Sequence, residues 1–285
     1  MARRLFRVPI ALVTLVDGNR QWFKANCGLA AQETPRDISF CGHAILGDEI
    51  LMIPDTLEDA RFADNPLVTR TPHIRFYAGC PLSYARDIRL GTLCLIDDKP
   101  RSFDEDDANT LRDLAAMVED ELRSFQASTT DVLTGISNRR GFQILAQFSL
   151  NDCLYHQTSA SLVFIDLDKF KQINDNYGHS AGDRALATFS GLLKSVFSHV
   201  DAIARLGGDE FVVLTTGKKL ADTERDISRL QHQITAINAT RSAPYELVFS
   251  YGIVEFDPQQ PQSLDELIAA GDAVMYQLKK AKSER

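Results

Sequence analysis

The chain has 285 residues, enough for two domains that each bury a hydrophobic core. Its hydrophobic content of 44% and charged content of 25% are typical of a globular protein, and its net charge of −8 argues against non-specific binding to nucleic acid. No apolar run is long enough to cross a bilayer, so we expect neither a nucleic-acid nor a membrane partner.

The five cysteines are scattered and form no C-x-x-C pair, which argues against a disulfide framework and fits a reducing cytoplasm. The basic and apolar start of the chain superficially resembles a signal peptide. Its apolar run ends in a turn at Asp17-Gly18, however, with no small-residue cleavage site. We therefore predict a strand that enters a turn, in a cytoplasmic protein.

The first part of the chain predicts two pairs of antiparallel strands with a helical, loop-rich region between them. The predicted elements are strands at 10–16 and 21–25, a short helix at 41–46, a Pro- and Asp-rich connection at 54–72, and strands at 75–82 and 89–97. This arrangement is typical of an α+β sensor domain, which we place at residues 1–101. Cys41 and His43 lie two positions apart, and no second pair completes a zinc site, so we favour structural roles for both.

Three segments of this region, 33–45, 61–66 and 90–97, resemble a bacterial branch of GAF domains. The resemblance implies an antiparallel-sheet domain that senses a small ligand, which the sequence does not identify. The aromatic residues of the region could line a ligand pocket or simply form the core: Trp22, Phe40, Phe76 and Tyr77. Such domains usually start with a longer helix, so we expect either a chain truncated at its start or a sheet without that cover.

Residues 102–130 predict a helical linker. Ser102 followed by Glu105 is a helix-start signature, with acidic residues in the first turn. Apolar residues recur near heptad spacing, interrupted by Glu121: Leu111, Leu114, Val118, Leu122 and Phe125. The helix either packs on its own domain or forms a short dimeric stalk that carries a signal into residue 131. We favour the stalk, because the chemistry inferred for the second domain needs two subunits.

The second part of the chain, residues 131–285, predicts alternating helices and strands. Their expected order is helix 139–150, strand 161–166, helices 169–177 and 182–198, hairpin 202–215, helix 219–239, strand 245–255 and helix 264–282. This is a βαββαβ order, typical of a ferredoxin-like or palm-type sheet, so the whole chain is of the α+β class.

Carboxylates mark two strand ends in this domain. The hairpin turns at Gly207-Gly208-Asp209-Glu210, and the buried strand 161–166 runs directly into Asp166. The hairpin alone could be an acidic, solvated turn. If the strand lies beside it, the three carboxylates converge, and such oxygen ligands suit Mg²⁺ or Mn²⁺. We therefore predict metal-assisted phosphoryl transfer.

The hairpin segment Arg205-Leu-Gly-Gly-Asp-Glu-Phe211 resembles the signature of the GGDEF family, the diguanylate cyclases. The likeness extends through segments 131–140, 166–175 and 176–183, in the family's order. It implies an enzyme that joins two GTP molecules into cyclic di-GMP and releases two pyrophosphates. Each active site would hold one GTP, so the resemblance also implies a homodimer.

The same resemblance implies a role for each matching position. The metal ligands would be Asp166, the Leu167 carbonyl, Asp209 and Glu210, with Asp209 and Glu210 also catalytic. The residues that bind substrate would be Phe170, Lys171, Asn174, Asp183, Gly207, Gly208 and Lys279. Among these, Asn174 and Asp183 would read the guanine edge, and Lys279 would bind phosphate.

Two departures from the family pattern concern arginines. Ser198 stands where members inhibited by their product carry an arginine, so we expect little inhibition through that site. Ser283 stands where a phosphate-binding arginine ends the family motif, which would weaken GTP binding. The alternative function is a non-catalytic protein that binds GTP or cyclic di-GMP and regulates a partner.

Overall fold

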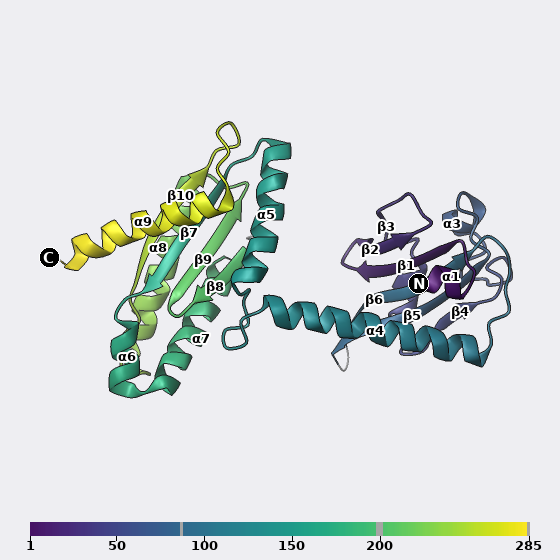
Figure 1. Ribbon diagram of the computed structural model, residues 1–285, viewed down its shortest axis with the longest axis horizontal. Coiled ribbons are helices and arrows are strands. Elements are labelled where there is room, and N and C mark those ends of the chain that lie inside the picture. Colours follow the sequence, from purple (N-terminus) through teal and green to yellow (C-terminus); the bar gives the residue numbers. More distant parts are fainter. Residues whose placement is uncertain (86–87, 198–201, 284–285) are drawn as a thin grey trace. The chain divides into compact units, whose positions relative to one another are not determined.

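A computed structural model of the protein describes residues 1–85, 88–197 and 202–283. The chain folds into two compact units, Met1–Phe125 and Gln126–Arg285, each with its own sheet and hydrophobic core (Figure 1). The division falls inside the predicted linker, residues 102–130. Within the described part of the chain, every helix is too short or too polar to span a bilayer.

The sheet of the N-terminal unit has six antiparallel strands in the order β3-β2-β1-β6-β5-β4. Their bounds are Ile10–Val16 for β1, Arg20–Cys27 for β2, Glu33–Pro35 for β3, Leu51–Ile53 for β4, Phe76–Ala85 for β5 and Ile88–Asp97 for β6. Both predicted strand pairs are confirmed, because β1 pairs with β2 and β5 pairs with β6. The short strands β3 and β4 extend the two edges, where the sequence had predicted none.

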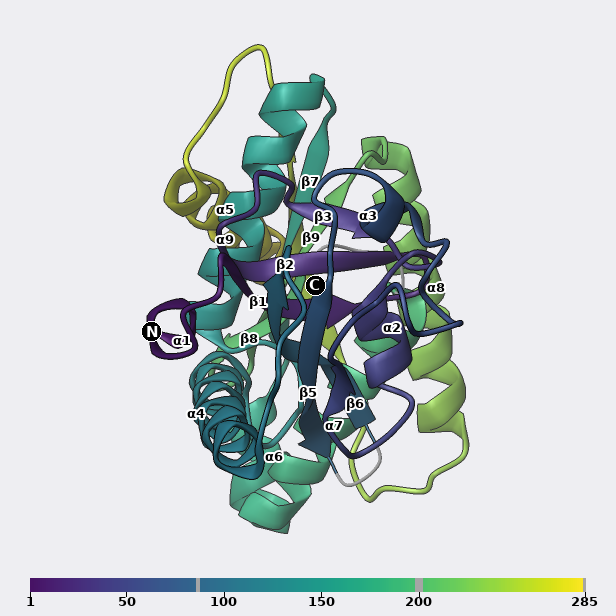
Figure 2. The ribbon, with the colours of Figure 1, turned by 90° about the vertical axis from the view of Figure 1, so that its right-hand side faces the viewer.

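Two hydrophobic cores lie on the two faces of this sheet. The helices of the unit are α1 (Ala2–Leu5), α2 (Phe40–Ala44), α3 (Pro66–Thr69) and α4 (Glu105–Thr129). Strand β6 contributes to both cores, since successive side chains of a strand point to opposite faces. Cys94 and Ile96 join the core of α2 and α3, whereas Leu93 and Leu95 join that of α4. Figure 2 shows α2 and α4 on opposite sides of the strands.

Helix α4 is capped differently from the prediction. The Asp107 N–H donates to Asp104 Oδ1 at 2.9 Å, and the Asp104 N–H lies 3.4 Å from Asp107 Oδ2. The predicted start signature at Ser102 is therefore wrong in detail. The carboxylate that directly precedes Glu105 bonds the first-turn amide instead, as in a capping box.

The two halves of α4 differ in burial. Leu111 and Ala115 are buried in the core of the N-terminal unit. Met117 and Phe125 are 60% and 46% exposed. The first half thus packs on its own unit, while the stalk remains a prediction for the second half.

The C-terminal unit has a four-stranded antiparallel sheet in the order β10-β7-β9-β8. The strands are β7 (Ala160–Leu167), β8 (Ala202–Gly207), β9 (Glu210–Thr216) and β10 (Phe249–Phe256), and the helices are α5 (Arg139–His156), α6 (Phe170–Tyr177), α7 (His179–Val196), α8 (Leu220–Ala239) and α9 (Leu264–Ser283). The first, second, third and fourth strands of the unit are therefore ordered 4-1-3-2 across the sheet. The predicted βαββαβ order and ferredoxin-like architecture are confirmed.

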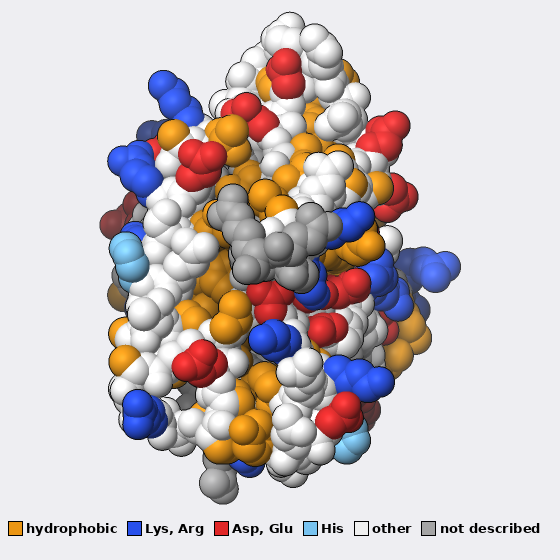
Figure 3. Space-filling view, turned by 90° about the vertical axis from the view of Figure 1, so that its left-hand side faces the viewer, with side chains coloured by type: hydrophobic (Ala, Val, Ile, Leu, Met, Phe, Trp, Pro, Cys, Tyr) orange, Lys and Arg blue, Asp and Glu red, His pale blue; other side chains and the backbone are white. Residues whose placement is uncertain are grey.

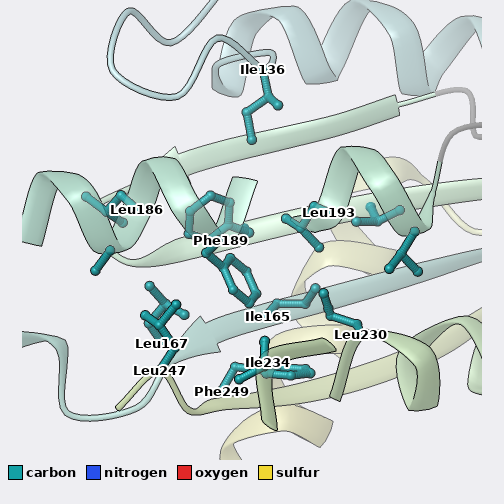
Figure 4. Close-up of a cluster of buried hydrophobic side chains, with 14 of the residues drawn as sticks. Ile136, Ile165, Leu167, Leu186, Phe189, Leu193, Leu230, Ile234, Leu247 and Phe249 are labelled. Carbon is teal, nitrogen blue, oxygen red and sulfur yellow. The ribbon is translucent and has the colours of Figure 1, made fainter. Parts of the chain in front are cut away.

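Helices cover both faces of this sheet. Side chains of α6, α7 and α8 share one core with β7, and those of α5 and α9 share the other. Figure 4 shows Phe189 of α7 in the first core. The centroid of its ring lies 5.0 Å from that of Phe211 and 5.6 Å from that of Phe249. Because both faces are covered, β7 is a nearly continuous apolar run until it reaches Asp166.

Candidate active site

The predicted carboxylates meet at one end of the C-terminal sheet. Strands β7 and β9 are adjacent and antiparallel, and their register places Asp166 opposite Glu210. The Leu167 N–H donates to the Asp209 carbonyl at 3.2 Å, which ties the end of β7 to the turn of the hairpin. The prediction that the strand lies beside the hairpin is confirmed.

The turn between β8 and β9 is open above its glycines. Gly208 has a φ of 51°, in the left-handed region that favours glycine. A Cβ built on Gly207 or Gly208 would meet no atom within 4 Å. The backbone of the turn is therefore accessible to a ligand.

The carboxylates repel one another. Burial raises the pKa of Asp166, and the charge of Asp209 raises it further. Burial also raises the pKa of Glu210, and the charges of Asp166 and Asp209 raise this pKa further. Negative charge is thus held close together and partly out of water, where a cation would stabilise it.

Lys279, from α9, supplies a positive charge at this place. Its ammonium donates a hydrogen bond to Asp166 and lies 3.9 Å from Asp168 Oδ1. Burial lowers the pKa of Lys279, but the hydrogen bond to Asp166 and the negative charges of the nearby carboxylates together outweigh burial, so the net shift is upward. Acidic and basic side chains gather on the face of the C-terminal unit drawn in Figure 3.

The donor set fits a hard divalent cation in its chemistry, because every candidate ligand is an oxygen. Among the described residues, however, no group of three or more His, Cys, Asp or Glu side chains is arranged to hold a metal ion. Asp166 and Glu210 are neighbours through strand register, and Asp209 contributes its carbonyl to Leu167. The assignment of the four predicted metal ligands therefore remains a prediction.

The predicted guanine-reading residues come from α6 and α7. A Cβ built on Gly182 would lie 2.0 Å from Asn174 Oδ1, so the Asn174 side chain rests directly against α7. Asp183, the next residue along α7, is exposed. The helices thus place Asn174 close to the residue that precedes Asp183.

The predicted phosphate-binding amides lie at the start of α6. Phe170 and Lys171 are its first two residues, and the first amides of a helix have no partner within it. Lys169, just before them, has a φ of 59° and turns the chain from the end of β7 into the helix.

A cavity of about 760 Å³ borders the site on the side of β10. Asp168, Lys279 and Ser250 line it, and the Ser250 hydroxyl donates to Asp168 at 2.8 Å. The cavity shares Lys279 with the predicted substrate residues, but its walls include neither Asn174 nor the two glycines. Strand register and the open turn are therefore better guides to the reaction site than this cavity.

Sequence reasoning missed an ion pair that supports the turn. Arg205 Nη1 lies 3.3 Å from both carboxylate oxygens of Asp131, and Arg205 Nε donates to the Gly208 carbonyl at 2.8 Å. Thr134 donates to Asp131 through its amide at 2.9 Å and its hydroxyl at 2.6 Å. The segment that follows α4 is thereby joined to the hairpin turn. Asp131 and Arg205 both lie in segments that resemble the GGDEF family, but nothing in the local sequence predicts their contact.

Charged neighbours of Glu210 were also missed. Arg139, at the start of α5, lowers the pKa of Glu210, whereas Asp272, on α9, raises it. The predicted product-inhibition position, Ser198, lies outside the described residues, as does the side chain of Ser283.

Two families match the chain. Residues 128–285 match the family described as "Diguanylate cyclase, GGDEF domain", and residues 1–122 match the family described as "GAF domain". Diguanylate cyclase DgcP of Escherichia coli is 33% identical over 267 residues, which cover 87% of this chain and 76% of that protein. A cyclic di-GMP phosphodiesterase of Pseudomonas aeruginosa is 42% identical over 144 residues, which cover 50% of this chain but only 24% of that protein.

A solved structure shares the fold of the C-terminal unit. It contains the coiled coil and GGDEF domain of DgcB from Caulobacter crescentus in complex with c-di-GMP. The TM-score is 0.56 at 21% identity, and the match covers 61% of this chain and 92% of that one. The two family matches and the likeness to DgcP show that the chain belongs to the GGDEF family of diguanylate cyclases, with a GAF domain before the GGDEF domain.

Proposed function

We propose that the protein is a diguanylate cyclase that condenses two GTP molecules into cyclic di-GMP and two pyrophosphates. The observation that carries this proposal is the register of β7 and β9, which pairs Asp166 with Glu210 beside the open glycine turn. Membership of the GGDEF family and the likeness to DgcP over most of the chain support it.

In this proposal Mg²⁺ or Mn²⁺ would be held by Asp166, Asp209, Glu210 and the Leu167 carbonyl. The metal would neutralise phosphate charge during phosphoryl transfer. The Glu210 carboxylate accepts a hydrogen bond from the attacking 3′ hydroxyl, which orients and polarises that hydroxyl.

The substrate is bound at both ends. Lys279 and the first amides of α6, those of Phe170 and Lys171, bind the phosphates. Asn174 and Asp183 pair with the guanine edge, where a carboxylate can accept both N1–H and N2–H₂. The open backbone at Gly207 and Gly208 lets the nucleotide lie against the hairpin.

Two subunits are required, because each site holds one GTP and the two nucleotides must face each other. The exposed apolar side chains of α4, Met117 and Phe125, support a homodimer formed along this helix. A GAF domain that binds a small ligand would then regulate how the two cyclase domains meet. Light scattering during size-exclusion chromatography tests the dimer: Phe125→Glu should shift the protein towards the monomer, whereas Arg123→Glu, at a polar exposed position of the same helix, should not.

The activity test is direct. Purified full-length protein is incubated with GTP and Mg²⁺, and cyclic di-GMP and pyrophosphate are quantified by chromatography. We expect two pyrophosphates for each cyclic di-GMP, and no product when a chelator removes the metal. A folded dimer that binds GTP or cyclic di-GMP without turnover would replace this proposal with the regulatory alternative.

A further inference from the structure

Two cysteine thiols lie side by side in the core of the N-terminal unit. Cys41 Sγ, on α2, is 3.8 Å from Cys94 Sγ, on β6. Both are free thiols, and both are buried. A disulfide bond needs a sulfur separation of about 2.05 Å, so a small movement of two packed elements would join them.

The surroundings give the two thiols different character. The Tyr77 hydroxyl donates to Cys41 Sγ at 3.3 Å. Burial raises the pKa of Cys41, but hydrogen bonds with Cys94 and with the hydroxyl groups around it outweigh burial and lower that pKa to about 6. The bond shared with Cys41, together with burial, raises the pKa of Cys94. Cys41 is thus suited to be a thiolate nucleophile beside a neutral thiol.

A cavity leads to the first of these thiols. It has a volume of about 470 Å³, and its walls include Cys41, Tyr77 and Phe40. Thr34 also lines it, and the Thr34 hydroxyl is buried with no hydrogen-bond partner among the described residues. Since one water molecule occupies about 30 Å³ of liquid, a small polar oxidant fits easily.

We propose that Cys41 and Cys94 form an oxidation site, which a small hydroperoxide converts into a disulfide. The Cys41 thiolate attacks the terminal peroxide oxygen; an S–O bond forms, the O–O bond breaks, and the departing oxygen takes up a proton. The Cys94 sulfur then attacks Cys41; the S–S bond forms, the S–O bond breaks, and the released hydroxide leaves as water with the Cys94 proton. The thiols lose two electrons in total, and the peroxide gains them.

The new bond would join α2 to the strand that carries α4 on its other face. Leu93 and Leu95, on either side of Cys94, pack in the same core as Leu111 of α4. The disulfide would therefore form on β6, the strand against which α4 packs. This step is independent of the cyclase chemistry proposed for the other unit.

The test uses the reduced full-length protein and hydrogen peroxide. Samples are quenched at intervals with an alkylating reagent in denaturant and mapped by mass spectrometry. We expect a peptide that links Cys41 to Cys94, with Cys41 lost on the order of ten times faster than Cys80. Cys80 is a matched reference, because it is buried in the same unit and burial raises its pKa to about 11.

Variants separate the two steps. Cys94→Ser should stop at a sulfenic acid on Cys41 that dimedone traps, whereas Cys80→Ser should still form the linked peptide. Oxidation of Cys41 no faster than that of Cys80, or oxidation without a linked peptide, would overturn the proposal. Mapping of the unsubstituted protein decides this even if a variant fails to fold.

Discussion

The two sheets of the protein place their polar groups differently. In the C-terminal unit, Asp166, Asp209 and Glu210 lie at the end of the sheet, within reach of solvent. In the N-terminal unit, Thr14 and Thr92 lie in mid-strand and are completely buried. Charges at a strand end can meet a charged substrate without the cost of full burial, whereas neutral groups inside a sheet must satisfy one another.

We expect the largest effect on activity from substitution of the carboxylates at the end of the C-terminal sheet. Asp209→Ala or Glu210→Ala should reduce cyclic di-GMP synthesis by more than about a hundredfold, because phosphate charge is then left unneutralised. Thermal unfolding followed by circular dichroism should show no loss of stability. Glu224→Ala, an exposed acid on α8, is the control and should keep full activity. Near-normal rates in both site variants would remove these residues from the active site.

Arg205 is a structural residue that lies next to the candidate site, since it forms an ion pair with Asp131 and a hydrogen bond to the hairpin turn. Arg205→Met should lower the free energy of unfolding by about 2 kcal/mol, because it breaks charged hydrogen bonds to Asp131 and Gly208. Activity should fall about tenfold as the turn loses its support. Arg225→Met, which breaks an exposed pair with Asp222, should cost less than about 0.5 kcal/mol. A loss of stability with an unchanged rate would make the pair purely structural.

The buried polar pair of the N-terminal sheet should show the opposite behaviour to the carboxylates. Thr14 Oγ1 lies 3.2 Å from Thr92 Oγ1 and accepts from the Thr92 amide at 3.3 Å. Thr14→Val should reduce stability by about 1 to 2 kcal/mol, because the Thr92 groups are left unsatisfied. Chemical denaturation measures this, and basal cyclase turnover at a permissive temperature should stay unchanged. A loss of turnover in the folded Thr14→Val variant would show that this buried pair also affects activity, contrary to the prediction.

Gly182 tests how the helices beside the carboxylates present Asn174. Gly182→Ala should raise the KM for GTP about fivefold and lower discrimination against ATP, because the added methyl displaces the Asn174 side chain. Gly191→Ala is a matched control on the same helix, where a Cβ meets nothing within 4 Å. It should keep the KM and gain about 0.5 kcal/mol of stability. Equal kinetics for both variants would place guanine recognition elsewhere.

The smallest effect concerns pH. The folded protein raises the pKa of Glu210 above its value in the unfolded chain, so ionisation of this group destabilises the fold. This penalty is absent near pH 4 and complete once the pH exceeds the folded pKa. Glu210→Gln should therefore raise the melting temperature at about pH 7.5 with a chelator present, by the equivalent of about 0.5 kcal/mol. Equal melting temperatures for the Glu210→Gln variant and the unsubstituted protein at every pH would mean that Arg139 fully compensates the burial of Glu210 and its repulsion by nearby carboxylates.

The sequence alone determined the elements that carry local patterns. The apolar run before Asp166, the paired glycines of the hairpin and the alternating helices and strands predicted the C-terminal sheet, because strand and turn preferences act over a few residues. The residue motifs predicted which side chains belong to the site. The cap of α4 was misplaced, since Asp104 and Ser102 offer competing signals within one turn.

The tertiary structure alone decided which distant residues touch. Lys279 pairs with Asp166 across 113 positions, Arg205 with Asp131 across 74, and Cys41 with Cys94 across 53. No local pattern encodes such pairs, because they form only when helices pack onto sheets and strand register is set. Burial then shifts the pKa values of Asp166, Glu210 and Cys41, since desolvation depends on neighbours supplied by the rest of the fold.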